Sequence, residues 1–222
     1  MTPAGRDLAE YWPVFGLRLA TPRLMLTPLR DDDLVETVDV ILGGLHAAAR
    51  MPFAVPWTDA PRAELIPNSL RYFWTARGSA TPDAWTLPFI VRRAGRVIGL
   101  QEMSGTDFPV TRKVDTGSWL GRAEQGHGFG TEMRSAVLQF AFDHLKATRA
   151  DSGAFVDNES SLRVSQKLGY RADGTDVLQR RPGEQAVEQR LTLAPGHFVR
   201  PGWDVQVAGL PNCRSFFGLT PA

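Results

Sequence analysis

The stretch that decides the fold is Gln125-Gly126-His127-Gly128-Phe129-Gly130-Thr131, which joins a predicted strand over 114–120 to an amphipathic helix over 130–146. Its pattern is Gln-x-x-Gly-x-Gly. Alternating glycines let the backbone turn tightly and bring its N–H groups close to a ligand. The helix that follows adds unpaired N–H groups and the positive end of its dipole, which suit a phosphate. The alternative is a glycine-rich turn that binds nothing.

Two common phosphate loops do not fit this stretch. A dinucleotide fingerprint requires a third glycine at position 131, which is Thr131, and a P-loop requires a lysine after Gly130. The pattern Gln/Arg-x-x-Gly-x-Gly/Ala between a strand and a helix is the pyrophosphate-binding motif of the GCN5-related N-acetyltransferases (GNAT), and residues 125–131 resemble it closely. The resemblance implies acyl-coenzyme A as the ligand.

A second motif strengthens the resemblance. Asn158-x-x-Ser161 is followed by Lys167-Leu168-Gly169-Tyr170, which is similar to the other signature of the same family. Asn158 is predicted to cap a short helix, and Gly169 to end it. The two motifs stand in order, separated by a helix and a strand, and the resemblance covers roughly residues 20–195. The phrase 21–29 also resembles the first strand of the subgroup that acetylates ribosomal-protein N-termini, the RimJ/RimL-like subgroup.

Composition narrows the classes of protein further. A length of 222 residues suits one domain with a sizeable core, and a net charge of +1 gives no reason to expect nucleic acid as a partner. The longest apolar runs fall short of the ~18 residues that a membrane span needs, so no membrane partner is expected. Residues 1–19 lack the apolar core of a signal peptide. Cys213 is the single cysteine, which excludes an internal disulfide and fits a cytoplasmic location.

The predicted fold is a single α/β GNAT-like domain over 20–195, preceded by an extension over 1–19 and followed by a tail over 196–222. Its sheet is expected to be mixed, mostly antiparallel and seven-stranded, with flanking helices. The seven strands are predicted at 21–29, 85–92, 96–103, 114–120, 149–155, 177–181 and 185–193. The tail contains Trp203, Phe216 and Phe217, and it is expected to pack on the domain or to meet a partner subunit in a homo-oligomer.

Glu102 is the predicted general base. Alternation along the strand 96–103 places Glu102 on one face with Ile98 and Leu100, where partial burial would raise the carboxyl pKa. By resemblance, this strand faces the acceptor cleft. The alternative is a structural carboxylate bonded to a neighbouring strand. Asp115 and Asp107 are lesser candidates for the base.

The resemblance also implies which residues hold the donor. The main chain of the strand before the motif would hold the pantetheine arm and the thioester oxygen, and the loop would hold the pyrophosphate. The predicted donor site comprises Trp119, Leu120, Gly121, Gln125, Gly126, His127, Gly128, Phe129, Gly130, Thr131, Asn158 and Ser161. The place of His127 inside the loop indicates contact with phosphate or solvent rather than catalysis.

The general acid is less well marked. Many family members carry an acid tyrosine seven residues after the asparagine, and this chain has Ser165 there. In the subgroup that acetylates N-termini, a serine matching Ser161 has the acid role, so Ser161 is the predicted acid, with helix capping as the alternative. The apolar stretch 51–57 is expected to wall the acceptor site through Phe53 and Trp57, unless these side chains only fill the core. No cluster of ligands has metal-binding spacing, so no metal is expected.

These observations predict an N-acyltransferase that moves an acyl group from acyl-coenzyme A directly to a primary amine. Acetyl-coenzyme A is the default donor, and succinyl-coenzyme A stays open because some actinobacterial relatives with these motifs use it. The acceptor could be a protein N-terminus, a lysine or a small amine. The rival hypothesis is a coenzyme A-binding sensor or partner-binding module without turnover, favoured by the missing tyrosine.

Overall fold

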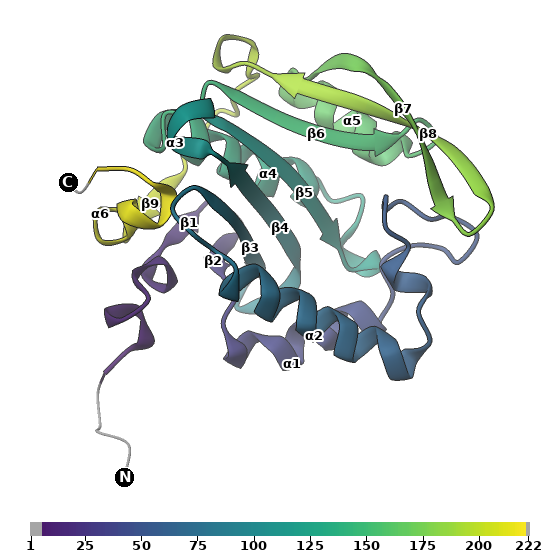
Figure 1. Ribbon diagram of the computed structural model, residues 1–222, viewed down its shortest axis with the longest axis horizontal. Helices are drawn as coiled ribbons and strands as arrows, with labels where there is room; N and C mark the ends of the chain where they lie inside the picture. The colour runs from purple at the N-terminus through teal and green to yellow at the C-terminus, as the bar shows by residue number, and fades with distance from the viewer. Residues whose placement is uncertain (1–5, 221–222) are drawn as a thin grey trace.

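The computed structural model describes residues 6–220 and is built around one nine-stranded sheet in the order β7-β8-β6-β5-β4-β3-β2-β1-β9 (Figure 1). All neighbouring strands are antiparallel except β5 and β6, which run parallel. The strands are β1 (Arg18–Ala20), β2 (Met25–Pro28), β3 (Ala84–Arg93), β4 (Arg96–Thr106), β5 (Lys113–Leu120), β6 (Arg149–Phe155), β7 (Arg171–Arg181), β8 (Glu184–Leu193) and β9 (Gln206–Ala208). The first five residues of the expected extension lie outside the described part of the chain.

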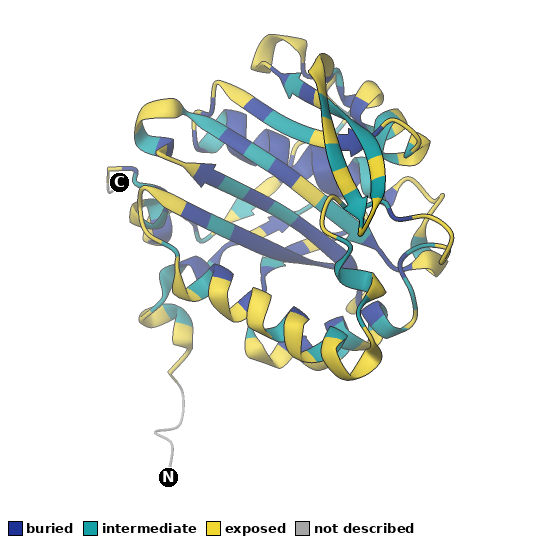
Figure 2. Ribbon diagram, turned by 45° about the vertical axis from the view of Figure 1, so that its right-hand side comes forward, coloured by how far each residue is buried: buried dark blue, intermediate teal, exposed yellow. Residues whose placement is uncertain are grey.

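Helices cover both faces of this sheet (Figure 1). The helices are α1 (Leu34–Leu42), α2 (Arg62–Gly78), α3 (Phe108–Thr111), α4 (Phe129–Gln139), α5 (Glu159–Leu168) and α6 (Leu210–Cys213). The larger hydrophobic core lies on the α4 side, and a smaller cluster joins α1 and α2 to the other face through Phe73, Ile90 and Leu100. The central strands are largely buried, whereas β7 and β8 are more exposed (Figure 2). The mixed α/β fold is therefore confirmed.

The expectation of seven strands was wrong, because β1 and β9 extend the sheet beyond β2. Leu19 lies opposite Leu26 of β2 on one side and Val207 of β9 on the other. Each added strand is three residues long, too short to show an alternating pattern in the sequence. Their pairing joins segments from opposite ends of the chain, which local periodicity does not reveal.

The C-terminal tail packs into the main core of the same chain. Phe217 is fully buried and contacts Trp85 of β3 edge-on, with ring centroids 5.1 Å apart. Phe216 also lies beside Trp85, at 6.3 Å. Cys213 is buried in the same region, where desolvation raises the pKa of its thiol to about 11, so the residue acts as a small apolar side chain.

A bulge in β4 corrects one part of the predicted alternation. Val91 pairs with Gly99 and Arg92 with Val97, so Ile98 is an extra residue. One extra residue reverses the faces of the strand residues before it. Val97 therefore joins Leu100 in the α1–α2 cluster, and Ile98 lies in the larger core on the α4 side. Glu102 shares its face with Leu100 but not with Ile98.

The parallel strands β5 and β6 separate soon after they meet. Their pairing covers only 113–115 with 149–151, although β5 continues to Leu120. Side chains bridge the point of separation: Thr116 Oγ1 donates to Asp151 O at 3.3 Å, and Ser152 Oγ donates to Thr116 O at 3.0 Å. Beyond this point β5 is paired with β4 alone, so one of its edges is free over 117–120.

Helix α4 is buried all round, including the polar side predicted to lie opposite its apolar stripe. Glu132, Arg134 and Gln139 are each less than one-tenth exposed. Glu132 binds Arg23 and Thr21, and Gln139 accepts a hydrogen bond from Val205 N at 3.0 Å. The segments before β2 and before β9 cover this side, which the helical period alone could not predict.

Candidate active site

The glycine loop has the left-handed backbone that its sequence indicates. Gly126 and Gly128 have φ angles of 83° and 82°, a region that favours glycine, and α4 starts at Phe129 directly after the loop. Residues 125–128 are exposed, whereas Phe129 is buried. An exposed loop that leads into a helix N-terminus can bind an anion.

Gln125 supports the loop from within. Its side-chain Nε2 donates to Leu120 O at 2.9 Å and to Leu45 O at 2.7 Å. These bonds fix the loop to the end of β5 and to the segment after α1. The glutamine of the motif therefore positions the backbone that precedes α4, and its own amide nitrogen is already used.

Two arginines that the sequence analysis missed flank the loop. Arg23 donates to His127 O at 3.2 Å and forms an ion pair with Glu132 at 2.6 Å. The guanidinium groups of Arg23 and Arg93 lie over the ring of Phe129, at 4.6 and 5.0 Å from its centroid. Arg23 precedes β2 and lies far from the glycine motif in the sequence, so its position gave little indication that it contacts the loop. Positive charge beside the loop fits a pyrophosphate ligand.

The end of β5 lies directly between the loop and the rest of the sheet. Trp119 and Leu120 pair with Leu100 and Gly99 of β4, and Gly121 N donates to Ile98 O of the same strand at 2.9 Å. A Cβ on Gly99 would lie 2.3 Å from Trp119 O, so only glycine permits this approach of β4 to β5. The opposite edge of β5 has no partner among the described strands over 117–120.

Helix α5 begins across the gap between β5 and β6. Asn158 is its N-cap, and Asn158 Oδ1 accepts hydrogen bonds from Ser161 N at 3.3 Å and from Ser160 Oγ at 2.9 Å. The predicted cap is therefore confirmed for Asn158. Gly169 ends the helix at φ 90°. The hydroxyl of Ser161 is not the capping group, and Ser161 is partly buried in the first turn.

Glu102 lies under α2, where Tyr72 contacts it. The hydroxyl of Tyr72 donates to Glu102 Oε2. Burial raises the pKa of the Glu102 carboxyl, and the Tyr72 hydrogen bond offsets part of that rise. Burial is also the main cause of a raised pKa at Tyr72, which stays protonated as a donor. Tyr72 was missed because its helix shows little apolar periodicity around it.

A row of aromatic rings leads from the segment after α1 to β5. His46, Phe53, Trp57 and Trp119 follow one another with centroid separations of 5.7, 5.3 and 6.4 Å. Trp119 lies opposite Leu100, two residues from Glu102 along β4. Phe53 and Trp57 are partly exposed, and Trp57 also packs against the α1–α2 cluster.

Ionic contacts join the segment after α1 to the β7–β8 hairpin. Arg181 of β7 binds Asp59, with Nε and Oδ2 2.5 Å apart, and its Nη2 donates to Ala48 O at 3.0 Å. Arg50 donates to Asp157 O, beyond the end of β6. The hairpin and this segment therefore meet over the same end of the sheet (Figure 1).

The lesser candidates for the base lie elsewhere. Asp115 is on β5 with Lys113 3.5 Å away, and Asp107 precedes α3 with a left-handed backbone. Among the described residues, no three His, Cys, Asp or Glu side chains are grouped so that they could hold a metal ion.

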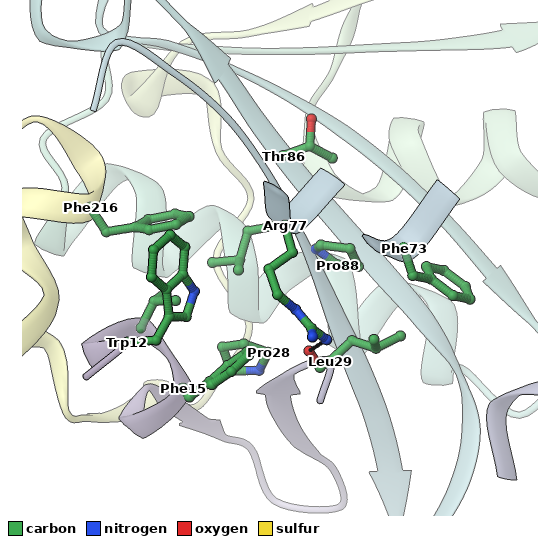
Figure 3. Close-up of a pocket in the computed structure, with 11 residues that line it drawn as sticks. Trp12, Phe15, Pro28, Leu29, Phe73, Arg77, Thr86, Pro88 and Phe216 are labelled. Atoms are coloured by element: carbon green, nitrogen blue, oxygen red, sulfur yellow. Dashed lines mark hydrogen bonds between the residues drawn. The ribbon is translucent and has the colours of Figure 1, made fainter. Parts of the chain in front are cut away.

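A small hollow lies beside the N-terminal segment (Figure 3). Trp12, Phe15 and Phe216 line it, and Arg77 crosses it to donate to Leu29 O at 3.2 Å. Its volume is about 20 Å³, enough for a water molecule or two and too small for a substrate. Neither Glu102 nor any residue of the glycine loop lines it.

Comparison with known proteins identifies the family. The acetyltransferase (GNAT) domain family matches residues 23–171, which include β2 to α5 and the glycine loop. The chain therefore belongs to the GNAT acetyltransferases. YdaF of Bacillus subtilis, named as a candidate ribosomal N-acetyltransferase, is 29% identical over 80 residues, which cover 36% of this chain and 43% of that protein. The chain thus matches less than half the length of that relative.

Solved structures show the same fold at low sequence identity. RimJ of Mycobacterium smegmatis in complex with CoA-disulfide has a TM-score of 0.65 and 16% identity, covering 92% of this chain and 95% of that one. RimL, a ribosomal L7/L12 alpha-N-protein acetyltransferase solved with coenzyme A, has a TM-score of 0.63 and 13% identity, covering 78% and 95%. At these identities the neighbours show that the fold is shared. Within residues 6–220, no helix has the length and apolarity to cross a membrane.

Proposed function

We propose that this chain is an N-acyltransferase that transfers an acyl group from acyl-coenzyme A to a primary amine without a covalent acyl-enzyme. One observation carries the proposal: the glycine loop follows β5, a strand that pairs with Glu102 of β4 on one edge and has no strand partner on its other edge over 117–120. Glu102 lies opposite Gly117 and Leu100 opposite Trp119, so the carboxylate flanks the stretch of β5 that leads into the loop. This pairing supports a route in which the pyrophosphate would bind at the loop and Glu102 would remove the proton farther along the same strand.

Each step of the reaction has a residue suited to it. Loop residues 126–131 would hold the pyrophosphate, with Arg23 and Arg93 adding positive charge, and the backbone of 119–121 would hold the thioester arm. Glu102 would take the proton of the incoming ammonium, directly or through a water. Its pKa, raised by burial, favours a base that works near neutral pH. Ser161 would donate to the departing sulfur.

Acetyl-coenzyme A is the proposed donor by default, and succinyl-coenzyme A is the alternative. The names of YdaF and RimL favour a protein N-terminus as the acceptor, with a lysine or a small amine as the alternatives. The aromatic row that includes Phe53 and Trp57 supports a protein N-terminus as the acceptor, because an extended peptide could pack along it.

A free-thiol release assay tests the proposal. Acetyl-, propionyl- and succinyl-coenzyme A would each be combined with peptides of free N-terminus, N-acetylated peptides containing lysine, and small amines. Amine-dependent thiol release is expected with at least one pair. Binding of coenzyme A without release from any pair would favour the rival, a coenzyme A sensor on the same fold.

Ser161→Ala is expected to lower turnover by about tenfold, the value of one hydrogen bond of about 1.4 kcal/mol, with donor affinity unchanged. The Ser161 hydroxyl is not the capping group of α5, and it lies in the first turn of that helix, beside the gap between β5 and β6. It is therefore available to donate to the departing sulfur. Ser160→Ala is the matched control, because Ser160 lies in the same turn and contacts Asn158. Steady-state kinetics and calorimetry measure the two effects. An unchanged rate with stability lowered by ~1 kcal/mol would assign Ser161 a structural role.

A further inference from the structure

An arginine that pairs with no carboxylate among residues 6–220 lies buried on α4, beside α5 and β5. Arg134 is 5% exposed. Its Nη1 donates to Ser165 Oγ on α5 at 3.1 Å, and its Nη2 donates to Ser118 Oγ on β5 at 3.0 Å. Its Nε is buried without a hydrogen-bond partner among the described residues. Both acceptors are neutral hydroxyls, so the positive charge is not compensated.

Such an arrangement is costly. Arginine stays protonated in proteins, and a buried charge without a partner costs several kcal/mol. Burial lowers the pKa of Arg134, and Tyr170 is the titratable group that acts on it. Burial also raises the pKa of Tyr170, whose hydroxyl lies 3.1 Å from Thr116 Oγ1 and stays neutral. Packing alone would be served better by an apolar residue at 134, so the guanidinium is suited to an anion that arrives during function.

The position of the guanidinium indicates which anion this is. Ser118 lies on β5 beyond its last pair with β6, on the stretch with a free edge. Ser165 lies on α5 four residues after Ser161, at the position where the family resemblance places an acid tyrosine. The guanidinium thus borders the gap that would receive the thioester arm. The inference rests on the proposed acyl-coenzyme A substrate.

We propose that Arg134 stabilises the thiolate of the departing coenzyme A. When the amine nitrogen attacks the thioester carbon, a C–N bond forms, the C–S bond breaks, and its electron pair passes to sulfur. The ammonium gives one proton to Glu102 before the nitrogen attacks, and the second proton that the nitrogen loses as the amide forms passes to water, so the sulfur leaves with the negative charge. A serine hydroxyl is a far weaker acid than a thiol, so Ser161 can donate a hydrogen bond to that sulfur but cannot neutralise it. A guanidinium fixed in place by two hydroxyls can offset the charge without reorganisation.

Binding of coenzyme A as a function of pH tests this role without turnover. Calorimetry would compare coenzyme A with desulfo-coenzyme A, which lacks the thiol, between pH 6.5 and pH 9.5. A free thiol has a pKa of about 8.5. If Arg134 lowers the pKa of the bound thiol by about one unit, the affinity ratio of coenzyme A to desulfo-coenzyme A rises roughly tenfold over this range. A flat ratio in the wild-type protein overturns the proposal.

Variants of Arg134 test whether its side chain causes the rise of the affinity ratio with pH. Arg134→Met keeps the stem but removes the charge, and we expect it to flatten the ratio while desulfo-coenzyme A still binds. Arg134→Lys should retain part of the rise. Arg163→Met is the matched control, because Arg163 is exposed on α5 and paired with Glu159, and it should behave like the wild type. A rise that persists in Arg134→Met would overturn the proposal.

The competing explanation for the buried charge of Arg134 is that it binds the terminal carboxylate of a donor such as succinyl-coenzyme A. Selective loss of succinyl-coenzyme A affinity in Arg134→Met, with acetyl-coenzyme A affinity and the pH ratio unchanged, would show that Arg134 recognises an acyl carboxylate and would overturn the thiolate role. Failure of wild-type protein to bind either coenzyme A or desulfo-coenzyme A would refute the acyl-coenzyme A site itself. The failure of the wider function is thereby distinguished from the failure of this inference.

Discussion

Glu102→Gln is expected to lower turnover by roughly 10²-fold or more, the lower end of general-base effects, while coenzyme A affinity stays unchanged. The amide keeps the shape of the side chain and can still bond to Tyr72, but it cannot take a proton from the acceptor ammonium. Glu102 lies on the side of β5 opposite the gap and has no contact with the glycine loop, so donor binding should be insensitive to it. Single-turnover kinetics with a saturating donor measure the loss.

A general base at Glu102 also fixes the direction in which turnover changes with pH. A base must be unprotonated to act, so the wild-type rate should rise with pH through the pKa of Glu102, which burial places above the ordinary glutamate value. Glu102→Gln should lose this acidic limb. Glu188→Gln is a suitable control, because burial also raises the pKa of Glu188 on β8. Retention of wild-type rate and pH profile in Glu102→Gln would make Glu102 structural.

The same raised pKa predicts an effect on stability. The folded protein binds the Glu102 proton more tightly than the unfolded chain does, so stability falls as pH rises between the unfolded and folded pKa values. Glutamine has no such dependence. The melting temperature of Glu102→Gln relative to the wild type should therefore be higher at pH 8 than at pH 4, as measured by calorimetry.

Gly128→Val is expected to weaken coenzyme A binding by roughly 10²-fold or more, about 2.7 kcal/mol. Gly128 has a φ of 82°, where a β-branched residue is strained, and it directly precedes α4. A valine there would both distort the loop and hold the pyrophosphate away from the backbone N–H groups. Gly130 is a weaker test than Gly128, because a Cβ at Gly130 would make only ordinary contacts, at 3.8 Å from Leu120.

A control must distinguish the general strain of a valine at positive φ from a specific block of coenzyme A binding at the loop. Gly183→Val is the matched control, because Gly183 has a φ of 77° in the β7–β8 turn with open space around it. Isothermal calorimetry should show wild-type coenzyme A affinity for Gly183→Val and little or none for Gly128→Val. Equal affinity in Gly128→Val and the wild type would remove the glycine loop from the donor site.

Local chemistry made much of the fold predictable. The glycine loop, the Asn158 cap and the Gly169 helix end depend on residues within one turn of each other, and each is found where the sequence indicates. The seven longer strands show apolar runs or alternation. The family could likewise be inferred because its two motifs are short and contiguous.

The remaining features depend on contacts between distant segments. The bulge at Ile98 is set by the register of β3 against β4, and no single-strand pattern marks it. Tyr72 reaches Glu102 from another element, and the surroundings of Arg134 come from α5 and β5. A polar residue opposite the apolar stripe of an amphipathic helix is expected to face solvent. The burial of Arg134 could therefore be seen only in the tertiary structure.

The pairing of β1 with β9 has a consequence for how this chain folds during synthesis. Leu19 leaves the ribosome early, but its partner Val207 follows only after nearly all the other strands have been made. Until then, β1 is the outermost strand on its side of the sheet, with one row of backbone groups open to other chains. The last strand of the sheet to be synthesised, β9, therefore protects the first, β1, against intermolecular pairing.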